Sequence, residues 1–421
     1  MDAFFQPKSV AIIGASAKEG KIGYEILKNV SKKARVFPVN PVRKEIDGIK
    51  CYRSVLDIED SIDLAIIAIA PDKILEAIEE CGEKGIKHVV VISGGFKESG
   101  NEEIEREMVR VARKYGIRII GPNCIGTFNG KNGFNTFFQR HMQLPDGGNV
   151  AILTQSGTFG IGLLEKLARE NIGVSKFVSY GNKCDVNEVD LIEYLEKDDE
   201  TEIIAIYAED FSPKFFERRY EKPIIVLKGG RSEAGKKAAR LHTGAMATNY
   251  DIFRGVCRQL GIITVDNFAE LFSIIKIMSM QPMPKNGKIV IITNGAGPAV
   301  VAADLIDEKE NLELAELIDL TGSATAYDYL NALENVGDDV GIVSLIFVFH
   351  DAPLAATLQK FYEGFRRKNA LYVAIAIGGK FVMEQKERLA ELSIPMFDEP
   401  SILINALDKV VWFKNEGSGN R

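Results

Sequence analysis

The sequence of 421 residues has few of the residues that build disulfide frameworks and metal centres. It contains five cysteines, none of them in a CxxC pair, and only four histidines. No cysteine or histidine cluster has zinc-binding spacing, so we predict no metal site and a reducing compartment. Because histidine is scarce, any reaction that needs an imidazole must use His88, His141, His242 or His350.

Long apolar runs and basic excess are also missing. The longest apolar stretch lies near Val340–Phe349, far short of a membrane span. The N-terminus lacks the basic and apolar regions of a secretion signal. Fifty-two basic and 59 acidic residues leave a net charge of −7, which argues against broad nucleic-acid or membrane binding. We therefore expect a soluble, cytoplasmic protein.

Short, continuous runs of Val and Ile are the strongest signal along the chain, and longer amphipathic stretches separate them. Such runs are typical of parallel strands buried on both faces, so the pattern predicts repeated βα units and a doubly wound α/β fold. The predicted strands are Val10–Ile13, Val36–Val39, Leu64–Ile69, His88–Ile92, Arg118–Ile120, Val150–Leu153, Phe177–Val178, Ile203–Tyr207, Ile224–Leu227, Ile262–Val265, Ile289–Ile292, Ile342–Phe349 and Leu371–Ile377.

Three of these strands run directly into a glycine turn, as SVAIIGAS, NVAILTQSGTFG and KIVIITNGAGP. Each opens a new βα series, and the turn-rich stretches LPDGGN and QPMPKNG precede the second and the third. We therefore predict domains over residues 1–143, 144–282 and 283–413. The polar residues 414–421 are expected to form a disordered tail.

The first glycine turn, Gly14 to Gly23, is a candidate phosphate-binding loop because it follows a strand and opens a helix. Its spacing is not GxGxxG, and the second strand ends in Asn40-Pro41 without the acid that would hold a nicotinamide ribose. Arg43 and Lys44 follow instead, which favours a phosphorylated ribose, as in coenzyme A or NADP. A tight turn that binds nothing is the alternative.

Two more loops end strands where open α/β sheets bind ligands, Gly94-Gly95 and Asn123-Cys124. Nothing nearby in the sequence activates Cys124 as a nucleophile, so we expect a buried and inert thiol.

The segment from Lys228 to Gly244 surrounds His242 with five cations and three internal glycines. It shows no amphipathic period, so we predict a loop at the carboxyl edge of the second sheet. A neutral imidazole is a competent nucleophile toward phosphoryl groups, and nearby cations would stabilise the transferring charge. A structural or solvated histidine is the alternative.

Two further features belong to the same predicted edge. Gln155, Ser156, Gly157 and Thr158 end a strand and start a helix, which is an anion-binding arrangement. Glu209-Asp210 ends the strand Ile203–Tyr207, and a carboxylate there could fix the imidazole tautomer. A solvated acid is the alternative for Glu209.

A series of stretches follows one another along the chain in a fixed order: VAIIGASAKEGKIGYEIL, VFPVNP, IKCY, GGFKESG, GPNCIG, LTQSGTFG, FVSYGNKCDV, IIAIYAED, PIIVLKGGRSEAGKKAARLHTGAMA, AELF and IITNGAGP. With them the sequence resembles the nucleoside-diphosphate-forming acyl-CoA synthetases, and within these the α subunits of ADP-forming acetate–CoA ligases, relatives of the succinyl-CoA synthetase α subunit. The resemblance implies a Rossmann-like CoA-binding domain followed by two flavodoxin-like domains.

The resemblance also implies a reaction, in which acyl-CoA, ADP and phosphate are converted reversibly to acid, CoA and ATP. His242 would carry the phosphoryl group, Glu209 would support it, and Gln155, Ser156, Gly157, Thr158 and Gly244 would line the phosphate site. The expected CoA-binding residues are Gly14, Ala15, Ser16, Gly20, Lys21, Gly23, Val39, Asn40, Pro41, Arg43, Lys44, Ala70, Pro71, Ser93, Gly94, Gly95, Asn123 and Cys124.

The chain departs from the family pattern at several places. Leu241 stands where the family usually has serine, the third domain looks short between Ala303 and Leu320, and no ATP-grasp segment follows residue 413. We therefore expect ADP and its Mg²⁺ on a separate ATP-grasp β subunit, as an α₂β₂ assembly. A non-catalytic CoA-binding regulatory module is the main alternative, and an NADP-dependent oxidoreductase is disfavoured by the missing GxGxxG.

Overall fold

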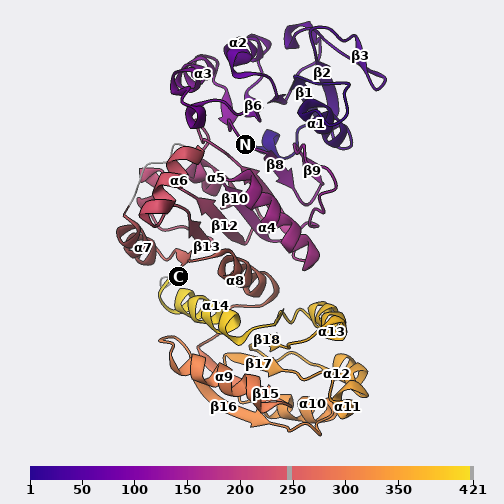
Figure 1. Ribbon diagram of the computed structural model, residues 1–421, viewed down its shortest axis with the longest axis vertical. Helices are drawn as coiled ribbons and strands as arrows, with labels where there is room; N and C mark the ends of the chain where they lie inside the picture. Colours follow the sequence, from indigo (N-terminus) through magenta and orange to yellow (C-terminus); the bar gives the residue numbers. More distant parts are fainter. Residues whose placement is uncertain (244–248, 418–421) are drawn as a thin grey trace. The chain divides into compact units, whose positions relative to one another are not determined.

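The computed structural model describes residues 1–243 and 249–417, with the backbone alone over residues 240–243. The chain divides into two compact units, Met1–Leu260 and Gly261–Arg421. The predicted α/β fold is confirmed, because largely parallel strands alternate with helices in each unit (Figure 1). The three-domain division stays a prediction, and the boundary between the two units coincides with neither predicted boundary.

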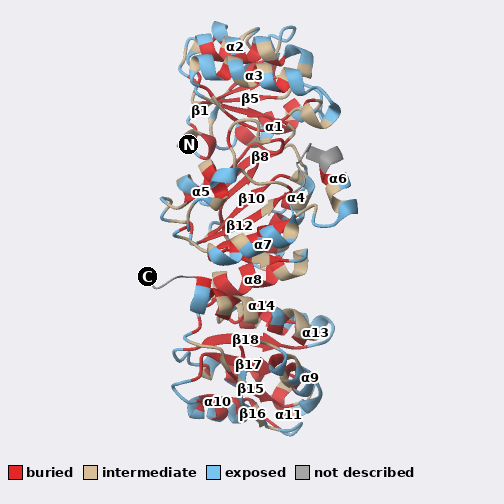
Figure 2. Ribbon diagram, turned by 90° about the vertical axis from the view of Figure 1, so that its left-hand side faces the viewer, coloured by how far each residue is buried: buried red, intermediate tan, exposed pale blue. Residues whose placement is uncertain are grey.

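The first sheet has the strand order β2-β1-β5-β6-β7, and all its strands are parallel. Its strands are buried on both faces because the helices between them cover the sheet, as Val- and Ile-rich runs require (Figure 2). The elements are β1 (Ser9–Ile13), α1 (Ile22–Val30), β2 (Arg35–Val39), β5 (Leu64–Ile67), α2 (Ile74–Lys84), β6 (His88–Val91), α3 (Glu102–Tyr115) and β7 (Arg118–Ile120), with the hairpin β3 (Glu45–Ile46) and β4 (Ile49–Lys50) and the short helices η1 (Asp2–Phe4), η2 (Val55–Asp57), η3 (Pro71–Lys73) and η4 (Lys97–Ser99).

The second sheet runs β13-β12-β10-β11-β8-β9 within the first unit. Its first four strands are parallel, whereas β8 pairs antiparallel with β11 and β9 pairs antiparallel with β8. These two strands come from the predicted first domain yet extend the sheet of the second. The elements are β8 (Gly126–Asn129), β9 (Phe134–Asn135), β10 (Val150–Thr154), α4 (Gly157–Arg169), β11 (Val174–Ser179), α5 (Glu188–Leu195), β12 (Ile203–Ala208), η5 (Pro213–Phe216), β13 (Ile224–Lys228), α6 (Glu233–Thr243) and α7 (Tyr250–Gln259).

The N-terminal residues connect the two sheets of this unit. The carbonyl oxygen of Phe5 accepts hydrogen bonds from Asn129 Nδ2 (3.2 Å) and Asn132 Nδ2 (3.3 Å), and its ring stacks on Tyr194 with centroids 5.2 Å apart. Phe4 packs edge-on against His88 of β6. Phe4 and Phe5 are fully buried, so the start of the chain forms a small hydrophobic core between the two sheets, which we call the N-terminal wedge.

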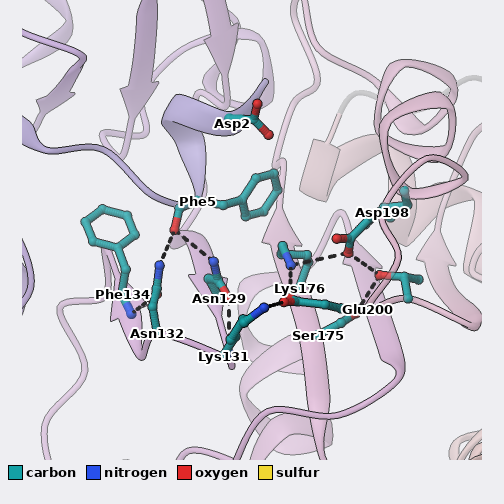
Figure 3. A network of polar contacts seen from close by, with 12 residues as sticks. Asp2, Phe5, Asn129, Lys131, Asn132, Phe134, Ser175, Lys176, Asp198 and Glu200 are labelled. Atoms are coloured by element: carbon teal, nitrogen blue, oxygen red, sulfur yellow. Dashed lines mark hydrogen bonds and ion pairs between the residues drawn. The ribbon is translucent and has the colours of Figure 1, made fainter.

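A buried ion-pair network lies near this contact, at the amino edge of the second sheet (Figure 3). Lys176 Nζ lies 2.8 Å from Glu200 Oε2 and 3.2 Å from Asp198 Oδ2, and the lysine side chain is 5% exposed. Lys131 also pairs with Glu200. The ammonium of Lys176 is therefore buried but compensated.

The second unit contains the third sheet, with the order β16-β15-β17-β18-β19 and all strands parallel. Helix α14 packs against α8 and α9. The elements are β14 (Ile263–Val265), α8 (Phe268–Met280), β15 (Lys288–Thr293), α9 (Ala296–Asp307), β16 (Glu313–Asp319), α10 (Ala326–Asn335), β17 (Ile342–Ile346), α11 (Ala352–Ala355), α12 (Leu358–Gly364), β18 (Leu371–Ile375), α13 (Lys380–Glu391), β19 (Met396–Phe397), α14 (Pro400–Trp412) and the π-helical turn η6 (Phe413–Gly417).

Two features of this unit differ from the sequence prediction. Strand β16, ELAELID, was not predicted, because it is a largely exposed edge strand and therefore carries no continuous apolar run. The tail predicted to be disordered is ordered in its first part, because residues 414–417 belong to η6, where Trp412 Nε1 donates to Glu416 Oε2 at 2.9 Å. Residues 418–421 lie outside the described residues.

Within residues 1–243 and 249–417, no helix has the length and apolar character that crossing a membrane requires.

Truncating the N-terminal wedge should destabilise the first unit. We expect Phe5→Ala to lower the free energy of unfolding by about 3 kcal/mol, because it removes a fully buried ring and the stacking of that ring on Tyr194. Urea unfolding followed by circular dichroism at constant protein concentration measures this loss. Tyr194→Phe is the matched control, since it keeps the stacked ring and removes only the hydroxyl that donates to Asp2 at 2.8 Å. Equal stability of the two variants would contradict the wedge.

Candidate active site

The first glycine turn is built by close backbone approaches. Gly14 has φ +93°, and a Cβ there would overlap the carbonyl oxygen of Ala68. A Cβ on Gly23 at the start of α1 would overlap the carbonyl oxygen of Gly14. Both positions therefore require glycine because of the path of the backbone itself. This requirement would be the same whether or not the turn binds a phosphate.

Asn40 closes this turn against the end of β2. Its Nδ2 donates to the carbonyl oxygen of Ala15 at 2.8 Å, and its Oδ1 accepts from the backbone N–H groups of Val42 (2.9 Å) and Arg43 (3.0 Å). Asn40 stands where a nicotinamide-binding domain has the acid that binds the ribose. Here its side chain joins the glycine turn to the segment that carries Arg43.

A basic cavity of about 390 Å³ opens beside that segment. Arg43 and Lys44, predicted from the sequence, lie on its wall together with Lys50 and Arg53, which were not. The hairpin of β3 and β4 returns the chain so that Glu45 pairs with Lys50. No local motif marks Lys50 or Arg53, so only the hairpin brings the four cations together. The rest of the lining is Val42, Cys51, Tyr52 and Asp57.

The loops after β5, β6 and β7 meet at the carboxyl edge of the first sheet. Ser93 Oγ donates to the carbonyl oxygen of Ile69 at 2.5 Å, and the N–H of Asn123 donates to the carbonyl oxygen of Ser93 at 2.8 Å. A Cβ on Gly95 would lie 2.8 Å from Pro71 Cγ. The structure therefore brings together the predicted residues of these three loops, Ala70, Pro71, Ser93, Gly94, Gly95, Asn123 and Cys124.

Cys124 is buried at this edge, and its thiol lies 3.3 Å from the carbonyl oxygen of Val91. Burial raises the pKa of the Cys124 thiol to about 12. The thiolate that a nucleophile needs is therefore absent at neutral pH, as the sequence analysis expected.

The carboxyl edge of the second sheet is organised by Gln155. Its Oε1 accepts from the backbone N–H groups of Glu209 (2.5 Å) and Asp210 (3.2 Å), and its Nε2 donates to Asp210 Oδ1 at 3.0 Å. The side chain expected to contact phosphate is thus engaged with the protein and fixes the dipeptide that carries the predicted carboxylate.

Ser156 caps helix α4, because its Oγ accepts from the N–H of Phe159 at 3.3 Å. The helix start at Gly157 and Thr158 lies next to the Gln155–Glu209 contact along the same edge, with the positive end of the helix dipole there. Phe159 stacks on Tyr207 at 4.2 Å between centroids.

Tyr207 and Gly229 flank Glu209. The hydroxyl of Tyr207 donates to Glu209 Oε1 at 3.4 Å, and burial together with the Glu209 carboxylate raises the pKa of Tyr207 to about 12. A Cβ on Gly229 would lie 2.9 Å from Tyr207 Oη and 3.0 Å from Glu209 Cγ. Glycine at 229 therefore leaves the room that the Glu209 side chain needs.

Two buried lysines hold the Glu209-Asp210 dipeptide. Lys183 Nζ lies 2.7 Å from Asp210 Oδ1, and Lys228 Nζ donates to the carbonyl oxygen of Glu209 at 2.8 Å. Burial alone would raise the pKa of Asp210, but Lys183 and Gln155 outweigh it and keep that pKa below its usual range. Burial lowers the pKa of Lys228, which is 3% exposed.

The predicted histidine loop is wrong for residues 233–243, which form helix α6. Ser232 caps the start of this helix, since its Oγ accepts from the N–H of Gly235 at 3.1 Å, and the following Ala, Lys and Arg residues are strong helix formers. His242 is the last residue but one of α6, and its side chain lies outside the described part of the chain. Gly244 also lies outside the described residues.

Helix α6 lies beside η4, which follows β6 of the first sheet. The edges also meet at the turn after β11, where a Cβ on Gly181 would overlap the carbonyl oxygens of Pro122 and Asn123. The Nδ2 of Asn182 donates to Glu98 Oε2 (2.6 Å), whose other carboxyl oxygen accepts from the N–H of Gly95 (2.5 Å). The predicted CoA edge and the predicted phosphoryl edge are therefore parts of one hydrogen-bonded region.

The described residues include no group of three or more His, Cys, Asp and Glu side chains that could hold a metal ion.

Comparison with known proteins identifies the family. The family model described as a CoA binding domain matches residues 8–129, and the one described as a succinyl-CoA ligase like flavodoxin domain matches residues 147–278. The α subunit of ADP-forming acetate–CoA ligase I of Pyrococcus furiosus is 37% identical over 98% of this chain and 98% of its own length. This chain belongs to the ADP-forming acetate–CoA ligase family.

Other members of the family extend the match. The α subunit of ligase II of Pyrococcus furiosus is 35% identical over 100% of this chain and 99% of its own length. ADP-forming acetate–CoA ligase I of Archaeoglobus fulgidus is 37% identical over 97% of this chain. The ligase of Methanocaldococcus jannaschii is 46% identical over 71% of it. The present chain spans only 63% and 43% of the length of these last two relatives.

Solved structures show the same fold over the whole chain. The dinucleotide forming acetyl-coenzyme A synthetase 1 of Ca. Korarchaeum cryptofilum, in complex with phosphate and ADP, has a TM-score of 0.88 and 33% identity, and the match covers 99% of this chain and 97% of that one. The protein PH0766 of Pyrococcus horikoshii has a TM-score of 0.84 and 33% identity, and the match covers 99% of each chain.

In this family member, the cysteine thiols should be almost unreactive while the fold persists. Burial raises the pKa of Cys81, Cys124 and Cys257 to about 12, so these thiols stay protonated near pH 8 and thiolate forms only as the pH approaches that value. We expect a chromogenic disulfide reagent to modify Cys51 first, because this residue lines the basic cavity, and to modify Cys81, Cys124 and Cys257 only in urea. Mass mapping after timed labelling measures this order. Rapid labelling of Cys124 in native protein would instead reveal an activated nucleophile.

Proposed function

We propose that this chain is the α subunit of an ADP-forming acyl-CoA synthetase, which converts acyl-CoA, ADP and phosphate reversibly to the free acid, CoA and ATP. The end-to-end match with two Pyrococcus furiosus chains named as α subunits of such ligases carries the proposal. The geometry supports it, since a buried edge that bears Glu209 lies in the same unit as the helix that bears His242 and as the CoA binding domain match.

CoA is proposed to bind the first domain along the residues expected from the sequence, from the Gly14 turn to the loops that end β5, β6 and β7. The four cations Arg43, Lys44, Lys50 and Arg53 give the adjacent cavity the charge that a phosphorylated ribose and a diphosphate require. Asn40 would couple the two parts of this site, because it bonds to the turn and to the cationic segment.

The first chemical step is proposed to be attack by a phosphate oxygen on the carbonyl carbon of the thioester. The carbon–sulfur bond breaks, CoA leaves as the thiol, and an acyl phosphate forms. The start of α4 at Ser156, Gly157 and Thr158 would hold the phosphate through backbone N–H groups and the helix dipole. Gln155 would contribute by fixing the neighbouring Glu209-Asp210 dipeptide.

The second step is proposed to be attack by a ring nitrogen of His242 on the phosphorus of the acyl phosphate. The bond from phosphorus to the acyl oxygen breaks, and the carboxylic acid leaves. A terminal oxygen of ADP then takes the phosphoryl group, which yields ATP and restores the imidazole. Glu209 would hold the ring in the productive tautomer.

ADP and its Mg²⁺ are proposed to bind a separate ATP-grasp β subunit, and the complex is proposed to be α₂β₂. The relatives from Archaeoglobus fulgidus and Methanocaldococcus jannaschii are longer than this chain, which supports the need for a further segment. The alternative of a CoA-binding regulatory module predicts CoA binding with no phosphoryl transfer in any assembly, and so the same experiments separate the two.

Phosphoryl transfer to His242 is tested by trapping the intermediate. The chain is incubated with an ATP-grasp β chain, acetyl-CoA and ³²P-phosphate in the absence of ADP. We expect acid-labile, alkali-stable label on this chain, and we expect His242→Ala to abolish both label and turnover because the accepting nitrogen is gone. Glu209→Gln should slow labelling and leave CoA binding intact. Normal labelling and turnover by His242→Ala would overturn this mechanism.

CoA recognition is tested through the ribose phosphate. We expect Arg43→Ala with Lys44→Ala to weaken CoA binding about tenfold and to weaken 3′-dephospho-CoA binding less, because phosphate contacts are lost. Isothermal titration calorimetry on the full chain measures both. Arg106→Ala with Arg113→Ala removes the same charge from exposed positions on α3 and is the matched control. Tight NAD binding without CoA binding would sink the assignment.

A further inference from the structure

Lys183 occupies the turn after β11 with all its ammonium protons engaged. Its Nζ lies 2.7 Å from Asp210 Oδ1, 2.9 Å from the carbonyl oxygen of Asp210 and 3.2 Å from Glu188 Oε2. Its side chain is 13% exposed and that of Glu188 is 0% exposed. An ion pair this buried costs much of its attraction in desolvation, so stability alone is a weak reason for it.

The backbone at Lys183 adds to the cost. Its φ is +48°, a conformation that residues with a Cβ seldom adopt outside turns. A lysine stays in such a position only where the surroundings over-determine it, and such positions concentrate at functional sites. The neighbouring Gly181 is fixed against the Pro122–Asn123 turn of the first sheet, so the lysine approaches Asp210 from a rigid support.

The Asp210 carboxylate decides how the Gln155 amide is oriented. Asp210 Oδ1 accepts from Gln155 Nε2, and therefore Gln155 Oε1 must face the N–H groups of Glu209 and Asp210. A protonated Asp210 could also donate to Gln155 Oε1, and it would then compete with the N–H of Glu209, whose residue is 5% exposed, for this acceptor.

We propose that Lys183 is a positioning residue for Glu209, acting through Asp210 and Gln155. The ammonium keeps Asp210 ionised, the carboxylate orients the Gln155 amide, and the amide oxygen holds the backbone of Glu209. Lys228 fixes the same residue from the other side through its carbonyl oxygen. The inference rests on the proposed role of Glu209 beside His242.

The charged groups around Asp210 define the expected pH response. They are Lys97 of η4, Lys183 after β11, Glu188 of α5, the neighbouring Glu209, and Lys228 at the end of β13; Tyr180 also faces Asp210 but stays neutral, because burial raises its pKa. In wild type, Lys183 holds the pKa of Asp210 low, so the carboxylate stays charged at neutral pH. Without this cation, burial raises the pKa of Asp210, and the rate falls as the pH drops through the raised value.

The test uses the whole chain with an ATP-grasp β chain, acetyl-CoA and ³²P-phosphate without ADP. Lys183→Met should slow labelling of this chain by about tenfold per folded molecule, with the CoA dissociation constant changed by less than about twofold. The ratio of its labelling rate to the wild-type rate at the same pH should recover as the pH is raised from about 6 to about 9, because the reacting groups titrate alike in both proteins and cancel in the ratio. Lys183→Arg should restore most of the rate at every pH.

Asp210→Asn in the Lys183→Met background separates positioning from folding. Asparagine does not ionise, so in the double variant the ratio to the wild-type labelling rate should no longer depend on pH. If Glu188, the other carboxylate paired with Lys183, caused the pH response, the double variant would still show a pH-dependent labelling rate, which would contradict the role given to Asp210. Lys176→Met is the matched control, because it removes an ion-paired ammonium that is even more buried, at the amino edge, and should lower stability without changing labelling or its pH profile.

Each outcome decides the proposal. Fast, pH-independent labelling by Lys183→Met would overturn it, as would slow labelling that neither pH nor Asp210→Asn corrects. If Lys176→Met lost as much labelling as Lys183→Met, the loss would be explained by lower stability alone, and the proposal would also be overturned. Absence of label on wild type would overturn the proposed function itself, which distinguishes that failure from a failure confined to Lys183.

Discussion

Parallel strand pairing is the constraint on which the rest of this structure depends. All strands of a parallel sheet end at one edge, and the loops that follow them must meet there. In the first unit this condition applies twice, once to β1, β5, β6 and β7 and once to β10, β11, β12 and β13. Residues as distant in sequence as Gln155 and Glu209 become direct neighbours for this reason. The carboxyl edges of the first and second sheets are in contact through short segments, η4 and the turn after β11.

Burying charged groups at the carboxyl edge of the second sheet costs desolvation free energy, and only complete pairing of these groups offsets that cost. Asp210, Lys183, Glu188 and Lys228 are largely withdrawn from water, and each has partners that satisfy its charge or its protons. Such a network is stiff, because any rearrangement would leave a buried group unpaired. Stiffness is what a site needs to hold one carboxylate, Glu209, in a single place while groups react beside it.

Helix α6 changes the physical setting of the proposed carrier. A histidine near the carboxyl end of a helix lies where the dipole favours positive charge and disfavours a phosphoryl group. Negative charge gained there would have to be compensated from outside the helix. The cations of α6 itself are partly engaged, since Lys236 pairs with Glu233 at 2.6 Å, and Lys228 is turned toward backbone oxygens. The start of α4 is a further source of positive potential along this edge.

The sequence by itself determined the α/β class, most strands, and the sheet edges where polar residues gather, because buried parallel strands leave unbroken Val and Ile runs and because glycine turns punctuate them. It also pointed to Arg43, Lys44 and Glu209 through their positions after strands. It could not show β16, whose edge position removes the apolar run, nor α6, because the glycines and cations of this segment also suit a loop. Only the tertiary structure brought Lys50 and Arg53 to the basic cavity and Lys183 to Asp210. Those contacts depend on a hairpin and on a turn pressed against another sheet, and no local pattern encodes a meeting between residues so far apart in the chain.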